Sequence, residues 1–346
     1  PHTRALLVAH IAGEPADMDP ILELARSRGL PVIEDCAQSH GARYHGRLVG
    51  TLGTVAAFST MSGKHHATGP QGGVVFSQNE EVGWRCKRFA DRGKPLGLEG
   101  GTNVRAGLNL NGNELAAAVG RVQLRRLPQI IGARRRVAGA IADGLAGATA
   151  VRLGRELPET EGVYWFVRVH VDTQRLTVNK DTFAHAVAAE GIPTNPSYRH
   201  LPAEADWFRR RRVFPPSDYP WGLPAYDGDR EATFPCPQAI EAVESHFLLH
   251  IHENFSGRDT ADIVAALRAG EPLPDKTVGI TIDDAVNSVI GEAWPRLSAA
   301  GFPFPLFVAT DAVDRRQARI MSWDDIRSLG KAGVTIANHS SPHGHL

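Results

Sequence analysis

The first 35 residues alternate between short apolar runs and one helix-like stretch, and this alternation constrains the fold more than any other feature. Ala5–His10 and Pro31–Asp35 are apolar runs, and Met18–Arg28 between them has helical periodicity and is followed by Gly29. A strand, a helix and a strand at this spacing predict a βαβ unit with parallel strands. Parallel sheets bind ligands at the carboxyl ends of their strands, where this chain places Asp35.

The same alternation continues to about residue 148, and a different pattern follows it. Further apolar runs and helical patterns occur at Thr54–Phe58, Gly73–Phe76, Glu80–Asp91, Asn113–Arg126 and Gln129–Leu145. Strand-like content and two helical stretches, Lys180–Glu190 and Gly257–Ala269, come next. We therefore expect a large domain with a mainly parallel sheet over residues 1–148 and a small α+β domain over residues 149–269. Tyr198–Pro237 is dense in Pro, Trp, Arg and Tyr and is expected to form a long irregular loop.

A third part follows a linker. Residues 270–275 (GEPLPD) have the composition of a linker, and strand and helix patterns alternate again after them. The patterns are Val278–Ile282, Val289–Ala300, Pro305–Thr310, Ser322–Ala332 and Val334–Ala337. Three strands in about 70 residues are too few to close a (β/α) barrel. We expect a partial barrel over residues 276–346, and a chain truncated at both ends because it also begins with Pro1.

Charge and cysteine content exclude several classes of function. Lys plus Arg and Asp plus Glu both total 38, so no net field favours a nucleic acid or an anionic membrane. No apolar run approaches the ~20 residues that span a bilayer. Three separated cysteines without a C-x-x-C pair build neither a disulfide framework nor a thiolate zinc site. We expect a cytoplasmic protein that binds neither nucleic acid nor membrane, while a leader before Pro1 stays open.

Two strings in the first part contain residues that suit one chemistry. VIEDCAQSHGA (Val32–Ala42) places Asp35 at a strand end, and FSTMSGKHHATGPQGG (Phe58–Gly73) places Lys64 after an apolar strand. A lysine in a partly dry site can have a lowered pKa and attack an aldehyde to form a Schiff base. An aspartate in the same site can keep a pyridine nitrogen protonated. Spacing alone also fits a solvated surface lysine.

These strings, with GLNLNGNELAAAVG at Gly107–Gly120, resemble the DegT/DnrJ/EryC1/StrS family of PLP-dependent sugar aminotransferases. The family has E-D-x-A-Q-x-x-G-A and F-S-x-x-x-x-K strings in this order, and the resemblance covers roughly residues 3–269. It implies an α/β protein of PLP-dependent transferase fold type I. The implied cofactor-binding residues are Asp35 (pyridinium nitrogen), Gln38 (phenolic oxygen), Ser59 (phosphate), Lys64 (Schiff base) and Asn109 (phosphate of a neighbouring subunit). The site would then be shared across a homodimer.

The resemblance also implies a reaction. Lys64 would hold pyridoxal 5′-phosphate and move a proton, an amino acid would donate the amino group, and a nucleotide-linked keto-sugar or a cyclitol ketone would accept it. A dehydratase branch of the family has histidine in place of the lysine, so Lys64 favours transamination. His65 and His66 depart from the family pattern, and we interpret both as packing or solvent-facing residues. We interpret His40 as a core residue.

Paired aspartates and paired histidines stand near two strand ends in the last part. GITIDDA ends a strand in Asp283 and Asp284, and NHSSPH places His339 and His343 four residues apart. At that spacing both imidazoles can face one cation. Two histidines and one aspartate leave a zinc position open for water, and the second aspartate can take a proton from that water. A chain with 15 histidines also produces such a pair without a metal.

These motifs resemble the first two motifs of NodB-type polysaccharide deacetylases, T-F-D-D-G and H-[ST]-x-x-H. The resemblance implies Asp283 as the catalytic base and Asp284, His339 and His343 as ligands of Zn²⁺ or another divalent metal. Ala285 replaces the glycine of the family motif. The family's later motifs would follow residue 346.

Three functions stay open at this point. The chain is a PLP-dependent aminotransferase of amino-sugar biosynthesis, a metal-dependent N-deacetylase with the first part as a scaffold, or a catalytically incomplete fragment. Two arginine runs, Arg134–Arg136 and Arg209–Arg212, are interpreted as solvated faces, with a grip on a sugar-nucleotide diphosphate as the alternative for the second run.

Overall fold

The computed structural model describes residues 3–69, 71–176, 178–270, 280 and 282–340, with no side-chain description for residues 338–340. The chain divides into two compact units, Pro1–Pro272 and Leu273–Leu346, and each is described by itself. The linker expected at residues 270–275 lies almost wholly outside the described residues. Among the described residues, no helix combines the length and the apolarity that crossing a membrane requires.

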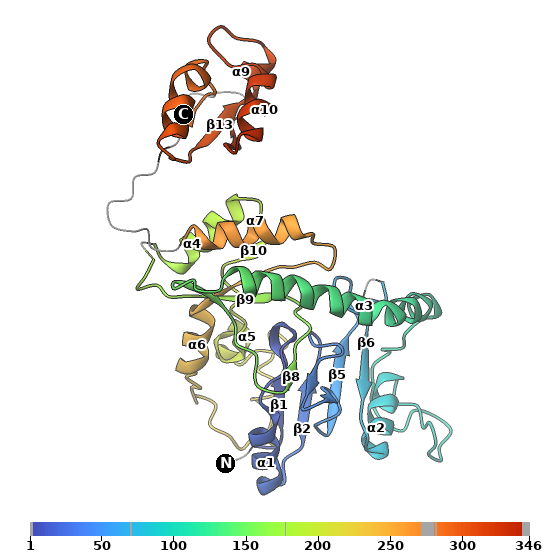
Figure 1. Cartoon of the computed structure of the whole chain (residues 1–346). Coiled ribbons are helices and arrows are strands. Elements are labelled where there is room, and N and C mark those ends of the chain that lie inside the picture. Colours follow the sequence, from blue (N-terminus) through green and yellow to red (C-terminus); the bar gives the residue numbers. More distant parts are fainter. Residues whose placement is uncertain (1–2, 70, 177, 271–279, 281, 341–346) are drawn as a thin grey trace. The chain divides into compact units, whose positions relative to one another are not determined.

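The first unit begins with a four-stranded sheet of order β1-β2-β5-β6 (Figure 1). Strands β1 (Leu6–Ala9), β2 (Val32–Asp35) and β5 (Val55–Ser59) are parallel, whereas β6 (Gly73–Phe76) is antiparallel to β5. The parallel pair predicted from the opening residues is confirmed. The register aligns the last residue of β2 with Ala9 and Ala57, so these strands end at the same edge.

Helix α1 (Met18–Arg28) connects β1 to β2 and begins and ends where the sequence predicts. Gly29 ends it in the left-handed conformation, at φ +63°, which a residue without a Cβ adopts at little cost. The side chain of Asp17 at the N-cap of α1 accepts no helix N–H. Its carboxylate accepts the Tyr44 hydroxyl instead, at 2.8 Å.

Two helices follow the sheet, and the second differs from the prediction. Helix α2 (Glu80–Ala90) is capped by Asn79, and α3 runs unbroken over Glu114–Gly144. The helical patterns over Asn113–Arg126 and Gln129–Leu145 predict two helices, and Pro128 between them removes one backbone N–H and crowds the preceding turn. Packing outweighs that cost: Leu127 and Ile131, on either side of Pro128, pack in the core of the first sheet, and Ile141 lies in the core of a second sheet.

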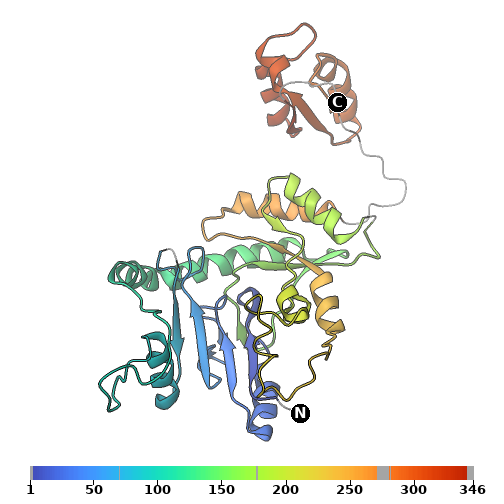
Figure 2. The ribbon, with the colours of Figure 1, turned by 180° about the vertical axis from the view of Figure 1, so that it is seen from behind.

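The second sheet is antiparallel, with order β10-β11-β9-β7. Its strands are β7 (Val151–Leu153), β9 (Val167–Val171), β10 (Thr194–Asn195) and β11 (His246–Leu249). Side chains of α3, α4 (Lys180–Ala189) and α7 (Gly257–Arg268) share one core with it. Figure 2 shows α4 and α7 lying together over this sheet from behind. The domain boundary expected near residue 148 stays a prediction.

Short elements complete the first unit. They are η1 (Ile11–Gly13), β3 (Arg43–Tyr44), β4 (Arg47–Leu48), β8 (Thr160–Glu161), η2 (Pro202–Glu204), α5 (Asp206–Arg209) and α6 (Pro237–Glu244). Between residues 198 and 236 only η2 and α5 are regular, as expected for this segment.

The second unit is a smaller parallel α/β arrangement of order β12-β13-β14. Its elements are β12 (Ile282–Asp283), η3 (Val289–Ala293), α8 (Trp294–Ala299), β13 (Pro305–Ala309), α9 (Thr310–Asp314), α10 (Trp323–Lys331) and β14 (Thr335–Ser340). Leu306, Met321 and Leu329 are fully buried in its core. Over the described residues it is a three-stranded sheet with helices, and the expected partial barrel stays a prediction.

Candidate functional site

Two predicted site residues stand at the carboxyl ends of adjacent strands. Asp35 ends β2 and Ser59 ends β5. The Oδ1 atom of Asp35 accepts the backbone N–H of Ala37 at 2.9 Å, and the Oγ atom of Ser59 accepts that of Met61 at 3.3 Å. Both side chains are thereby oriented by the turns that follow their strands, at the sheet edge where such folds bind ligands.

Lys64 lies in the turn after β5, and its amine interacts with Asp35. The backbone N–H of Lys64 donates to the carbonyl of Met61 at 3.2 Å, and the side chain is half-buried. Burial lowers the pKa of Lys64 from 10.5 to about 8, although the negative charge of Asp35 acts in the opposite direction. An amine with this pKa is neutral in roughly a tenth of the molecules at pH 7. The structure thus brings a reactive amine and a carboxylate to one edge.

Gln38 holds two other segments at this edge. Its Oε1 atom accepts the backbone N–H of Ala12 at 2.7 Å, and its Nε2 atom donates to the Tyr198 hydroxyl at 3.2 Å. The Tyr198 ring packs against Phe166, with centroids 5.4 Å apart. Gln38 therefore joins η1 and the irregular segment to the turn after β2.

Asn109 is the one predicted cofactor residue that lies elsewhere. It is exposed, its Oδ1 atom accepts the side-chain amide of Asn111 at 3.0 Å, and its backbone forms a bridge with Asp91. Figure 1 shows α2 and the following loop beyond the β6 edge of the sheet. Within one chain, Asn109 is not part of the group around Asp35 and Lys64.

The residues beside Lys64 anchor its turn. His65 is 2% exposed, and its Nε2 atom donates to the carbonyl of Val163 at 2.9 Å. Burial, assisted by the charge of Arg134, lowers the pKa of His65 to about 3, so this imidazole is neutral. The Nε2 atom of His66 donates to the carbonyl of Gly120 in α3 at 3.0 Å. These contacts agree with the packing role expected for both histidines.

The segment around Trp165 faces this turn, and no sequence pattern predicts that it does. The Nζ atom of Lys64 lies 3.3 Å from the ring centroid of Trp165, and the indole N–H of Trp165 donates to the carbonyl of Gly63 at 3.1 Å. The aromatic run from Tyr164 to Phe166 was interpreted only as strand content. No spacing rule connects it to Lys64, because the contact is made by the tertiary fold.

Arg134 was also misinterpreted. It is 7% exposed, not solvated, and forms an ion pair with Glu253 at 3.1 Å. Its Nη1 atom donates to three backbone carbonyls, those of Tyr164 (3.2 Å), Trp165 (3.2 Å) and Ile251 (3.1 Å). Arg134 therefore fixes the segment that faces Lys64, and the prediction of a solvated face for this residue is wrong.

A buried group of His10, Glu34 and Cys36 has the residue types of a metal site. The backbone N–H of Ala16 donates to Nδ1 of His10 at 3.0 Å, so Nε2 carries the proton and donates to Glu34 at 3.1 Å. Glu34 also accepts the backbone N–H groups of Gly50 (2.7 Å), Leu52 (2.8 Å) and Gly53 (2.6 Å).

Burial, with a contribution from Glu34, raises the pKa of the Cys36 thiol to about 12. Hydrogen bonds already use the ring nitrogens of His10 and the carboxylate of Glu34, and the Cys36 thiol keeps its proton, so the group is structural.

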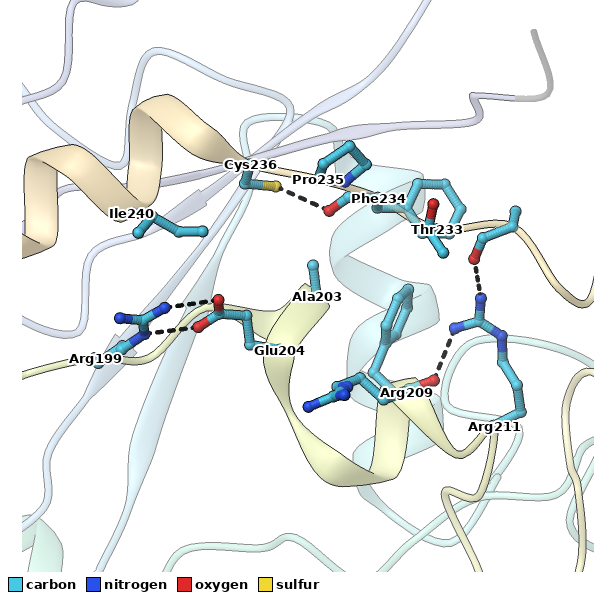
Figure 3. Close-up of a pocket in the computed structure, with 12 residues that line it drawn as sticks. Arg199, Ala203, Glu204, Arg209, Arg211, Thr233, Phe234, Pro235, Cys236 and Ile240 are labelled. Atoms are coloured by element: carbon cyan, nitrogen blue, oxygen red, sulfur yellow. Dashed lines mark hydrogen bonds and ion pairs between the residues drawn. The ribbon is translucent and has the colours of Figure 1, made fainter.

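A cavity of about 670 Å³ lies in the segment from Arg199 to Ile240 (Figure 3). Arg199 forms ion pairs with Glu204 and Glu244, both at 2.7 Å. Arg211 donates to the carbonyl of Phe208 at 2.7 Å, and its Cζ atom lies over the Phe208 ring, 4.7 Å from the ring centroid. Arg199 follows Tyr198, the partner of Gln38, so the cavity adjoins the segment that reaches the strand-end site.

In the second unit, the strand that ends in Asp283 and the strand that contains His339 belong to one sheet. β12 and β14 flank β13 in parallel register, and Asp283 ends β12. Asp284 and Ala285 have positive φ, +70° and +49°, in the region that favours glycine. His339 lies in β14, but its side chain and all of His343 lie outside the described residues. The metal ligand set therefore stays a prediction.

Comparison with known proteins settles the family. The profile of the DegT/DnrJ/EryC1/StrS aminotransferase family matches residues 1–268. The chain belongs to this family. A polysaccharide deacetylase profile matches residues 270–346, so a deacetylase domain follows the aminotransferase region. Both predicted resemblances are confirmed.

Curated relatives of the chain include a dTDP-sugar transaminase and GDP-perosamine synthases. The dTDP-3-amino-3,4,6-trideoxy-alpha-D-glucose transaminase of Streptomyces venezuelae is 38% identical over 201 residues, 57% of this chain and 50% of that protein. The GDP-perosamine synthase of Escherichia coli O157:H7 is 31% identical over 196 residues, 57% of this chain and 52% of that protein. The chain thus spans about half the length of the curated relatives it matches.

Solved structures support the fold. DesV of S. venezuelae, in complex with a ketimine intermediate, superposes with a TM-score of 0.65 at 28% identity, over 79% of this chain and 67% of DesV. Aminotransferase TlmJ of Streptoalloteichus hindustanus gives a TM-score of 0.62 at 28% identity, over 78% of this chain and 66% of TlmJ. The α/β fold of a PLP-dependent sugar aminotransferase is confirmed over this part of the chain.

Proposed function

We propose that the aminotransferase region uses pyridoxal 5′-phosphate to transfer an amino group from an amino acid to a keto-sugar or a cyclitol ketone. The observation that carries this proposal is the half-buried Lys64 amine, which follows β5, has its pKa lowered to about 8 and interacts with the charge of Asp35 at the carboxyl end of the neighbouring parallel strand β2. The family is PLP-dependent, and this donor set fits the cofactor. A partly neutral amine suits an aldehyde, and a carboxylate suits a pyridinium nitrogen.

Each of the strand-end residues has a role in the proposal. Asp35 keeps the pyridine nitrogen protonated, so that the bound cofactor withdraws electrons from the carbon that loses its proton. Lys64 holds the cofactor and carries a proton at Nζ during transfer. Gln38 would lie beside the phenolic oxygen of the bound cofactor. The Ser59 oxygen accepts the N–H of Met61, which leaves its own hydrogen to donate to phosphate.

The proposed substrate class follows from the relatives and the cavity. The relatives include a dTDP-sugar transaminase, GDP-perosamine synthases and a 3-amino-5-hydroxybenzoate synthase. We assign a nucleotide-linked keto-sugar as the acceptor, with a cyclitol ketone as the alternative. Arg199, Arg209 and Arg211 line this cavity. Arg199 is paired with Glu204 and Glu244, and Arg211 donates to backbone carbonyls, so Arg209 is the arginine that we assign to a phosphate group.

The proposal includes a homodimer in which Asn109 reaches the phosphate held by the partner chain. Large apolar side chains are exposed on the first half of α3 and on β6: Leu115 (82%), Val119 (46%), Val122 (54%), Val74 (51%) and Val75 (56%). Exposed apolar surface of this extent marks an interaction site in soluble proteins. Asn109 lies in the loop that leads into α3, so a partner on this face would meet it.

An absorbance titration tests the cofactor assignment. The full chain should develop a visible absorbance band with added pyridoxal 5′-phosphate, because the cofactor attached to a lysine absorbs differently from the free aldehyde. The Lys64→Ala variant should lose the band, and Lys87→Ala, at an exposed position on α2, should keep it. A band that survives Lys64→Ala would contradict the proposal.

A second candidate function belongs to the deacetylase domain. We propose that Asp284, His339 and His343 bind Zn²⁺ or another divalent metal, with Asp283 as the base that activates water for amide hydrolysis. The parallel register of β12, β13 and β14 supports it, because the strand that ends in Asp283 and the strand that carries His339 belong to one sheet. One equivalent of zinc that restores hydrolysis of an N-acetylated sugar would support this function. A chain that binds neither cofactor nor zinc would be a catalytically incomplete fragment.

A further inference from the structure

We infer that Trp165 is a positioning residue for the Lys64 amine, an inference that rests on the proposed function of Lys64. The Nζ atom of Lys64 lies 3.3 Å from the centroid of the Trp165 ring. An ammonium group over the face of an aromatic ring is attracted by the ring quadrupole, and tryptophan provides the strongest such contact. The ring thus gives the protonated amine a defined resting place at the carboxyl edge of the sheet.

The ring is held by the same turn that carries the lysine. Its Nε1–H donates to the carbonyl of Gly63 at 3.1 Å. The backbone N–H of Trp165 donates to the carbonyl of Ala12 at 2.8 Å, and its carbonyl accepts Nη1 of the buried Arg134 at 3.2 Å. The ring and the backbone of the lysine turn therefore belong to one hydrogen-bonded frame.

The same frame confines movement to the lysine side chain. His65 and His66 anchor the turn to Val163 and to Gly120 of α3, at 2.9 and 3.0 Å. With the backbone held on both sides, the flexible four-carbon stem of Lys64 is the part that can swing. The amine can then leave the ring to react and return to it after an amino donor displaces it, without rearrangement of the loop.

The charges around the amine favour its protonated form against the effect of burial. Asp35 contributes a negative charge, and the Trp165 ring contributes its negative face. Burial lowers the pKa of His40 to about 4 and that of His65 to about 3, so neither imidazole carries a charge near pH 7. Asp35, by its charge, and Trp165, by its ring face, are therefore two groups that attract the ammonium, while Arg134 is paired with Glu253.

Competitive labelling of the full chain without cofactor tests this inference. Brief exposure to acetic anhydride across a pH series, followed by mass spectrometry of the peptide that contains Lys64, gives the pKa of this amine. Trp165→Phe keeps a weaker ring, and Trp165→Leu keeps apolar bulk without a ring. We expect the pKa to fall in the order Trp, Phe, Leu, with about half a unit to one unit between Trp and Leu. Lys87 in the same digests should not change.

Equal pKa values in the three proteins, or a higher value in Trp165→Leu, would overturn the inference. Thermal melts establish that each variant is folded, and Trp165→Phe decides the question if Trp165→Leu does not fold. A second readout is the pH midpoint of the rate at which pyridoxal 5′-phosphate attaches, which should move with the pKa. Failure of the unsubstituted chain to attach the cofactor would contradict the proposed function, and the labelling order would still decide the role of Trp165.

Discussion

The Nζ atom of Lys64 lies 3.3 Å from the ring centroid of Trp165, so the loop after β5 and the segment before β9 meet at the amine. One of these segments follows the parallel sheet and the other leads into the antiparallel sheet. The position of the amine therefore depends on how the two sheets pack within the first unit. Substitutions at the contacts that maintain this packing should therefore change the free energy of unfolding of the first unit.

Gly13→Ala should destabilise the first unit by about 2 kcal/mol or more. Gly13 has φ +88°, and a Cβ there would lie 2.8 Å from the backbone nitrogen of Tyr164 and 3.0 Å from that of Trp165. Chemical denaturation measures the change. Gly29→Ala is the control, because Gly29 also has positive φ but a Cβ would meet nothing within 4 Å. The Gly29→Ala substitution should lower the free energy of unfolding by only about 1 kcal/mol. Equal costs would show that the close approach of η1 is not important.

Arg134→Ala should destabilise the chain by about 3–5 kcal/mol, because it leaves Glu253 and three backbone carbonyls without their donor. The matched control is Arg136→Ala, two residues later on the same helix at an exposed position, which should stay within about 0.5 kcal/mol of the unsubstituted chain. Urea denaturation of both variants checks this prediction. A small effect at Arg134 would contradict the anchoring role.

Glu34→Gln should destabilise the chain by about 2–4 kcal/mol at pH 7, because the amide places N–H groups against backbone donors. Burial raises the pKa of Glu34, but His10 and three backbone N–H groups outweigh it and hold the pKa below its ordinary value of 4.5. The stability from the carboxylate is therefore present above pH 4.5 and is lost as the pH falls through the lowered folded pKa.

Denaturation of both proteins across this pH range measures that difference. The gap between the unsubstituted chain and Glu34→Gln should narrow as the pH falls below 4.5. A gap that is constant with pH would mean that the ionised carboxylate is not the stabilising form.

Whether a feature of the fold or of the candidate site can be predicted from the sequence depends on whether its contacts are local in the sequence. The bounds of α1, the strand ends at Asp35 and Ser59 and the position of Lys64 after β5 follow from periodicity and turn chemistry within a few residues. The contacts of Trp165 and the burial of Arg134 depend on which faces two sheets present to each other. No local pattern contains that information.

Pro128 shows that a local sequence signal can also predict the wrong element boundary. Its chemistry predicts a helix end, yet α3 continues because Leu127 and Ile131, on either side of Pro128, pack in the core of the first sheet. Local preference is a weak determinant where burial on this scale opposes it.

Leu115→Glu should weaken the proposed homodimer at least tenfold without affecting the fold. Leu115 is 82% exposed on α3, so a charge at this position makes no difference to packing within one chain. It destabilises association only if a second chain covers this surface. Sedimentation velocity at several concentrations gives the association constant. Leu24→Glu, at a half-exposed position on α1, is the control and should leave association unchanged. A monomeric unsubstituted chain would contradict the shared site.

The central claim is that the Lys64 amine holds pyridoxal 5′-phosphate. Borohydride reduction of the chain with bound cofactor fixes the cofactor to its lysine, and mass spectrometry of the digest then locates it. The account predicts one pyridoxyl group per chain, on the peptide that contains Lys64. A label on Lys94, Lys180 or another lysine, with Lys64 unmodified, would contradict it.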